Sequence, residues 1–147
     1  MKSQNALIAY VHATSVGNPG PATIGYMIHT STGDPVETKT LEVADFTANQ
    51  ALYRALVIVL GRAQLLAAKV RVYCSIEFVV GQMNGRLRVK DHALIPLHAK
   101  ARELAAAVNG LVQFIPKKDN PAVLISKSHR KTKMLWNRQP SHGLSIN

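Results

Sequence analysis

The sequence predicts an α/β protein with a five-stranded mixed sheet, three antiparallel strands followed by parallel strands, and helices on its faces. Three β-rich segments joined by short turns occupy residues 6–43, as in an antiparallel meander. From residue 47 onward, helical patterns separate two further β-rich segments, and this order of elements describes one mixed sheet covered by helices. The 147 residues suit one domain that can bury its own core.

The first three strands are expected at residues 6–12, 22–30 and 36–43. The first is a continuous apolar, β-rich run, which indicates a buried strand. A Gly-Asn-Pro-Gly-Pro turn at residues 17–21 separates it from the second strand, and a Thr-Ser-Thr-Gly-Asp turn at residues 30–34 follows. Alternation in the third segment indicates a strand with two different faces, which completes the meander.

A long helix is expected to begin after Thr47. Thr47 and Gln50 fit a capping box, in which the Thr hydroxyl accepts from the backbone N–H of residue 50 and the Gln side chain reaches back. An apolar stripe with helical spacing then predicts the buried face of this helix. Its members are Leu52, Leu56, Val59 and Ala63.

The rest of the chain is expected to add two strands and three helices. These are a strand at 69–75, a short helix at 77–83 ended by Asn-Gly, a helix around Pro96, a strand at 111–115 and a final helix opened by Asn120-Pro121. Alternation in the fourth strand predicts that Cys74 points into the core and Ser75 away from it. We expect one domain over residues 1–126 and a basic C-terminal tail over residues 127–147, with a packed terminal helix as the alternative for the tail.

The composition points to a phosphate-bearing partner. The chain has 18 Lys and Arg against 8 Asp and Glu, and residues 117–147 alone hold seven basic residues and one acid. The electrostatic field of such a positive charge attracts nucleic acids, although charge alone does not identify the partner. A single cysteine, Cys74, permits no internal disulfide and fits a reducing compartment. No apolar stretch has the length of a membrane span and no signal peptide is recognisable, so we expect a cytoplasmic protein.

Five sequence blocks resemble a known family. The blocks GNPGPATIG, TANQALY, EFVVGQMNG, VKDHALIPLHAKAREL and IPKKDN are similar to consecutive segments of bacterial type 1 ribonuclease H proteins, in the same order and spacing, from about residue 6 to 125. The resemblance implies the ribonuclease H-like fold, which agrees with the sheet predicted above. It also implies an activity, because that family cuts the RNA strand of RNA–DNA hybrids with two magnesium ions.

The resemblance further implies four carboxylates that hold the two ions. Magnesium requires hard oxygen ligands, and paired ions about 3.5–4 Å apart activate water and stabilise the leaving oxygen. In this chain the four positions carry other residues, which are His12, Leu52, Ser75 and Leu124. Imidazole prefers softer ions, a hydroxyl is a poor ligand and leucine is none. We therefore expect no catalytic residue and no magnesium or manganese site, and the protein to be catalytically inactive.

Three of these four positions also have a purely structural interpretation. Leu52 completes the apolar stripe of the long helix, and Leu124 would do the same for the final helix. His12 reads as a strand histidine with satisfied hydrogen bonds. A zinc site built from His12 and Cys74 is disfavoured, because Cys74 is expected to face the core.

Binding residues can survive where catalytic residues are lost. By resemblance, the turn residues Gly17, Asn18 and Gly20 approach ribose hydroxyls, the groups that distinguish RNA-containing duplexes from B-DNA. Thr47 and Asn49 match positions near the phosphate and the groove, with helix capping as the alternative role of Thr47. In the tail we expect phosphate contacts from Lys127, Arg130, Lys131 and Lys133.

Three functions remain open. The first is binding of RNA–DNA hybrid or double-stranded RNA without metal-dependent cleavage. The second is a scaffold that uses the fold for self-association or a protein partner; a homodimer would use the apolar segment Met134-Leu135-Trp136, although Trp136 could instead stack on a base. The third is weak hybrid-specific ribonuclease activity through non-standard ligands.

Overall fold

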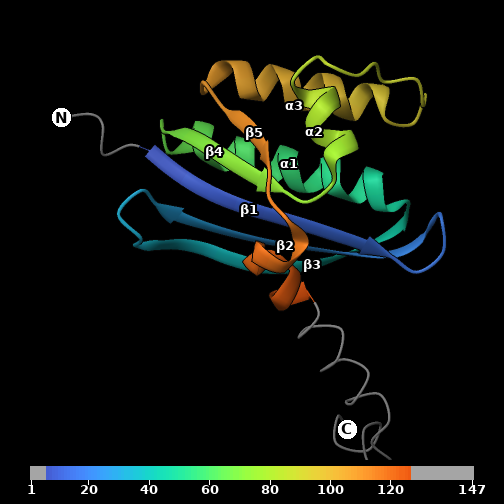
Figure 1. Cartoon of the computed structure of the whole chain (residues 1–147), viewed down its shortest axis with the longest axis horizontal. Helices are drawn as coiled ribbons and strands as arrows, with labels where there is room; N and C mark the ends of the chain where they lie inside the picture. Colours follow the sequence, from blue (N-terminus) through green and yellow to red (C-terminus); the bar gives the residue numbers. More distant parts are fainter. Residues whose placement is uncertain (1–5, 127–147) are drawn as a thin grey trace, which may run out of the picture.

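Five strands form one mixed sheet in the computed structural model, which describes residues 6–126. The strand order is β3-β2-β1-β4-β5 (Figure 1). The strands are β1 (Ala6–Ser15), β2 (Gly20–Thr30), β3 (Pro35–Phe46), β4 (Lys69–Cys74) and β5 (Leu111–Phe114). β1 pairs antiparallel with β2 and β2 with β3, whereas β4 runs parallel to both β1 and β5. The predicted fold class is confirmed.

The helices are α1 (Ala48–Leu65), α2 (Glu77–Met83) and α3 (Ile95–Ala107). A short 3₁₀ helix (Lys117–Asp119) follows β5, and residues 121–126 are helical. Figure 1 shows the chain crossing from β5 to residues 121–126, which lie beside β2 and away from α2 and α3. Within residues 6–126 no helix has the length and apolar composition needed to cross a membrane.

The meander strands are longer than predicted. The ladder between β1 and β2 continues from Leu7↔Thr30 to Ser15↔Ala22, so three residues that look like the start of the turn belong to β1. β3 likewise continues to Phe46, directly before the cap of α1. Backbone pairing sets these ends, and pairing has no local sequence signature at the polar residues Thr14 and Ser15.

Strand alternation divides the sheet into two faces. In β1, Leu7, Ala9, Val11 and Ala13 are all buried on the face against which α1 packs. The predicted stripe of α1 is confirmed: Leu52, Leu56, Val59 and Ala63 are each at most 1% exposed. Cys74 belongs to the same core, as predicted, and burial raises the pKa of its thiol to about 11.

Candidate nucleic-acid interface

The turn between β1 and β2 is built from backbone geometry that its glycines permit. Gly17 has a φ of +92°, a conformation that residues with a Cβ rarely adopt. A Cβ on Gly20 would overlap the carbonyl oxygen of Val16. The Val16 N–H donates to the Pro21 carbonyl at 2.8 Å and closes the turn. Residues 16–19 are exposed, so their backbone is open to a ligand.

Ser15 holds this turn against the start of α1. Its Oγ lies 2.6 Å from the Gly17 carbonyl oxygen and 2.8 Å from the Phe46 carbonyl oxygen. Gly20 is paired with Phe46 in the ladder between β2 and β3. Phe46 directly precedes Thr47, so the structure brings the two predicted groups of binding residues to one edge of the molecule.

The first turn of α1 carries no acidic side chain. The predicted capping box is confirmed: the Gln50 N–H donates to Thr47 Oγ1 at 3.1 Å, and the Thr47 N–H donates to Gln50 Oε1 at 2.7 Å. The Thr47 hydroxyl therefore has a structural role. The free N–H groups and the dipole of an 18-residue helix make this end favourable for an anion.

Asn120 fastens the C-terminal helical segment to the ends of β1 and β4. Its Nδ2 donates to the Val11 carbonyl at 3.0 Å and to Ser75 Oγ at 3.1 Å. Its Oδ1 accepts from the Ala122 N–H at 3.0 Å, which is the N-cap bond expected for an Asn-Pro helix start. Asn120 is 2% exposed; its bonds to Val11 and Ala122 are buried, and its bond to Ser75 is partly buried.

The C-terminal segment covers the sheet face opposite α1. A Cβ on Gly25 would meet Ser126 Oγ and the Ala122 carbonyl, so the helix touches the backbone of β2 there. Gly25 is paired with His12, and directly paired residues face the same side of a sheet. His12 is 7% exposed and so lies buried on the face that this segment covers.

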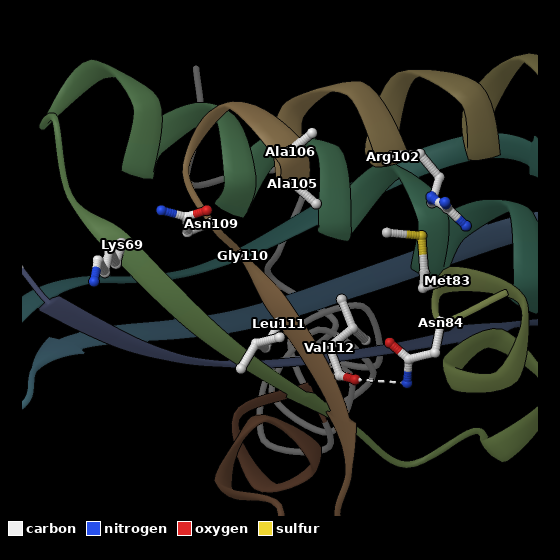
Figure 2. Close-up of a pocket in the computed structure, with 10 residues that line it drawn as sticks. All are labelled: Lys69, Met83, Asn84, Arg102, Ala105, Ala106, Asn109, Gly110, Leu111 and Val112. Atoms are coloured by element: carbon white, nitrogen blue, oxygen red, sulfur yellow. Dashed lines mark hydrogen bonds between the residues drawn. The ribbon is translucent and has the colours of Figure 1, made fainter.

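Two cavities of similar volume open on the surface of the described part of the chain, besides a smaller one of about 250 Å³ at the start of β1. One, of about 600 Å³, includes Asn49 among its lining residues. The other, of about 560 Å³, lies between β5, α2 and α3, with Lys69 and Arg102 toward its two ends (Figure 2). None of the predicted site residues lines this second cavity, where Asn84 Nδ2 donates to the Val112 carbonyl at 3.1 Å.

Comparison with known proteins identifies the family, although no family model matches the chain. The bifunctional protein Rv2228c of Mycobacterium tuberculosis is 33% identical over 109 residues, which are 72% of this chain and 30% of that protein. The chain therefore spans about a third of the length of the curated relatives it matches. The crystal structure of LC11-RNase H1 in complex with an RNA/DNA hybrid is 31% identical, with a TM-score of 0.71, over 78% of this chain and 88% of that one.

The chain belongs to the type 1 ribonuclease H-like family. Two further structures agree. The N-terminal RNase H domain of Rv2228c has a TM-score of 0.77 and 28% identity over 82% of this chain and 95% of that one. RNase H1 from Halobacterium salinarum has a TM-score of 0.75 and 26% identity over 82% of this chain and 93% of that one.

In this ribonuclease H-like chain, three of the four positions implied by the resemblance are connected through Asn120. It bonds Ser75, bonds the carbonyl of the residue before His12, and starts the helical segment that contains Leu124. Leu52 is the fifth residue of α1 and is buried. Among residues 6–126, no three His, Cys, Asp or Glu side chains are grouped closely enough to hold a metal ion.

The structural interpretation of these positions is right for Leu52 and wrong for Leu124. Leu52 is 1% exposed and completes the core stripe. Leu124 is 66% exposed, because the helical segment turns Ala122, Val123 and Ser126 inward instead. The four tail residues Lys127, Arg130, Lys131 and Lys133, and the Met134-Leu135-Trp136 segment, lie outside the described residues, so the expectations for them stay predictions.

Sequence reasoning missed three structural roles at this site. Ser15 was not expected to join the turn to α1, and Asn120 was expected only as a helix cap. Gln82, which is 1% exposed, accepts from the Tyr53 hydroxyl at 2.7 Å through Oε1. An amide within a mostly apolar helical segment is the one signal that could have drawn attention to Gln82, since such a group needs partners when buried.

Proposed function

We propose that this protein binds RNA–DNA hybrid or double-stranded RNA and does not cleave it with divalent metal. The observation that carries the proposal has two parts. The turn at Gly17–Gly20 is intact, and the side chains at the four positions that hold metal in the family do not suit magnesium. Support for the partner comes from the family, since LC11-RNase H1 has been solved in complex with an RNA/DNA hybrid. The net charge of +10 supports a partner that is a phosphate polymer.

The residues at the four positions do not fit a pair of magnesium ions. Two are leucines, one of them buried in the core. The third is Ser75, whose Oγ is already bonded by Asn120. The fourth is His12, a nitrogen ligand on a buried strand, and magnesium selects carboxylate, carbonyl and water oxygens.

The same replacements change the electrostatics for a duplex. Four carboxylates would repel a phosphodiester unless metal neutralised them, whereas an imidazole, a hydroxyl and two leucines carry no such repulsion. With no acid in the first turn of α1, the backbone N–H groups of that end can approach phosphate directly. Binding should therefore not require divalent ions.

A filter-binding titration of a labelled hybrid in EDTA tests this proposal. We expect binding that persists in EDTA and weakens with salt, because each phosphate neutralised by Lys or Arg adds about 0.9 to the log–log salt slope on B-DNA. Charge-neutralising variants of Lys127, Arg130, Lys131 and Lys133 should lower the slope by about one each. Affinity that disappears on chelation contradicts the proposal. Absence of binding at low salt would favour the scaffold function instead.

A further inference from the structure

A pair of stacked tyrosines lies on the sheet face opposite α1. Tyr10 on β1 and Tyr73 on β4 are partners in the ladder, and their ring centroids lie 5.4 Å apart with an interplanar angle of 21°. Tyr10 precedes His12 by two residues, so both side chains point to the same face. Residues 121–126 cover this face near His12 and Gly25. Tyr10 and Tyr73 lie farther along the strands and are both partly exposed.

The register of the ladders places polar side chains beside this pair. Gln113 on the edge strand β5 is the partner of Tyr73 and is exposed. Arg71, two residues before Tyr73 on β4, points to the same face and is also exposed. On the other side of the pair, the centroid of the His29 ring lies 5.9 Å from that of Tyr10. The aromatic surface is therefore bordered by an amide and a cation.

A small hollow continues this surface toward the start of β1. Its volume is about 250 Å³, and its polar lining residues are Ser31, Lys69, Arg71 and Asn109. None of its lining residues is acidic, and neither Lys69 nor Arg71 forms an ion pair with a carboxylate of residues 6–126. Sites for whole small molecules are larger, about 300–1,000 Å³. The hollow therefore suits one anionic group of a longer ligand, such as a phosphate.

A single-stranded nucleic acid matches this arrangement of groups. Proteins that bind single strands combine aromatic side chains, on which bases stack, with cations that follow the phosphate backbone. The two tyrosines supply the aromatic surface, and the Gln113 amide can both donate to and accept from the edge of a base. Arg71 and Lys69 supply the cations. In a duplex the bases are stacked and paired, so their faces are closed to such a surface.

We propose that this surface, the tyrosine face, binds a segment of single-stranded RNA or DNA. The tyrosine face comprises the hollow and the residues Tyr10, Arg71, Tyr73 and Gln113. A base would stack on the tyrosine pair and bond Gln113, and the adjoining phosphate would lie against Arg71 and Lys69.

The tyrosine face is separate from the proposed duplex interface. Ile8, which lines the hollow, precedes Ser15 by seven residues along β1, a distance of about 23 Å at about 3.3 Å per residue. Ser15 holds the turn of the duplex interface, and the two surfaces share no residue. The inference therefore does not rest on duplex binding and can hold if that proposal fails.

Fluorescence anisotropy of a labelled thymidine octamer, titrated with the full chain in EDTA, tests the inference. The octamer should bind saturably and about fivefold or more tightly than an abasic octamer of equal charge, because only the former has bases to stack. Tyr73→Leu should weaken binding of the thymidine octamer about fivefold or more, whereas Tyr73→Phe keeps the ring and should stay within about twofold of wild type. Neither variant should change the affinity for a hybrid duplex by more than about twofold.

A second pair of variants tests the cation. Arg71→Ala should lower the slope of the log–log salt dependence by about 0.7, the contribution of one phosphate contact on a single strand. The matched control is Arg102→Ala, which removes the same charge from an exposed position on α3 and should leave that slope unchanged. Arg71 is exposed, so its substitution is expected to retain the fold, and circular dichroism of each variant checks this.

Four outcomes would overturn the inference. The first is no saturable binding of the thymidine octamer at about 0.1 mM protein. The second is equal affinity for the abasic octamer, which would leave the tyrosines without a role. The third is unchanged binding in folded Tyr73→Leu and Arg71→Ala. The fourth is a change in the emission of Trp136 in Tyr73→Leu with unchanged octamer affinity, which would assign the tyrosine face to residues 127–147 of the same chain.

Discussion

Asn120 Nδ2 lies 3.1 Å from Ser75 Oγ and joins the C-terminal helical segment to the end of β4. The same nitrogen donates to the Val11 carbonyl on β1, so one buried amide connects three parts of the chain. Each of these three parts carries one residue that the resemblance places at a metal-binding position. In this protein that region is held together by neutral hydrogen bonds.

Asn120→Ala should destabilise the protein by about 2–4 kcal/mol. The substitution leaves the buried Val11 carbonyl without this donor and removes the helix cap, each worth about 1–2 kcal/mol or more. Urea denaturation measures the free energy of unfolding. Ser75→Ala is the matched control and should cost about 1 kcal/mol or less, because Asn120 keeps its other two bonds. A Ser75 effect as large as the Asn120 effect would contradict this role.

Leu52→Glu should destabilise the fold strongly, whereas Leu124→Asp should leave its stability nearly unchanged. Leu52 is 1% exposed, so an acidic group there would be buried without a partner and should cost more than about 2 kcal/mol. Leu124 is 66% exposed, so Leu124→Asp should change the free energy of unfolding by less than about 0.5 kcal/mol. Thermal and urea denaturation of both variants check this. Equal effects would show that the two leucines do not differ in burial as described.

Gly20→Ala should disrupt the turn and weaken duplex binding together. The added Cβ overlaps the Val16 carbonyl oxygen, and the backbone must move to relieve it, at a cost of about 2 kcal/mol or more. Gly61→Ala is the control, since nothing lies within 4 Å of its added Cβ in the middle of α1. That substitution should stabilise the helix by about 0.5–1 kcal/mol and leave binding unchanged. Normal binding by the Gly20 variant would remove the turn from the proposed interface.

Glu37 should make the stability of the protein depend on acid pH. Its carboxylate accepts from Arg62 Nε at 2.9 Å and from the Tyr26 hydroxyl at 2.7 Å. The Arg62 bond is the main cause that lowers the pKa of Glu37 below its ordinary value. This contribution is present above the pKa of Glu in the unfolded chain and is lost as pH falls through the lower, folded-state value.

Comparison of wild type with Glu37→Gln measures that contribution. The difference in their free energies of unfolding should be larger at neutral pH than at a pH below the folded-state pKa of Glu37, where the carboxylate is protonated in both states. The Arg62 side chain is 46% exposed and the Glu37 side chain 21%, so solvent ions reach the pair and the difference should also shrink in high salt. A difference that grows on acidification would have the wrong sign.

Local patterns in the sequence predicted the elements and much of the packing. The alternation in residues 36–43, the Thr47 capping box and the Leu52 stripe each have a physical cause within a few residues, and each is confirmed. The order of strands and helices was sufficient to predict one mixed sheet. The turn at Gly17–Gly20 was also recognisable, because its glycines serve the backbone locally.

The features that sequence could not predict depend on distant partners. Asn120 is 109 residues from Val11 and 45 from Ser75, and no local pattern encodes these bonds. The prediction for Leu124 was wrong because the segment packs on the opposite sheet face from α1, so a different side of the helix is buried. The pairing of Gln82 with Tyr53 likewise depends on how α2 packs against α1.

The most direct test of the proposed absence of hydrolysis uses a labelled RNA–DNA hybrid. The hybrid is incubated with an excess of protein that has been purified free of host ribonucleases. Binding is followed by mobility shift in EDTA, and the RNA strand is then examined on a denaturing gel after addition of magnesium or manganese. The hybrid should be bound in EDTA, and its RNA strand should remain intact in both metals. Metal-dependent cleavage that co-elutes with the folded protein in chromatography would contradict the proposal.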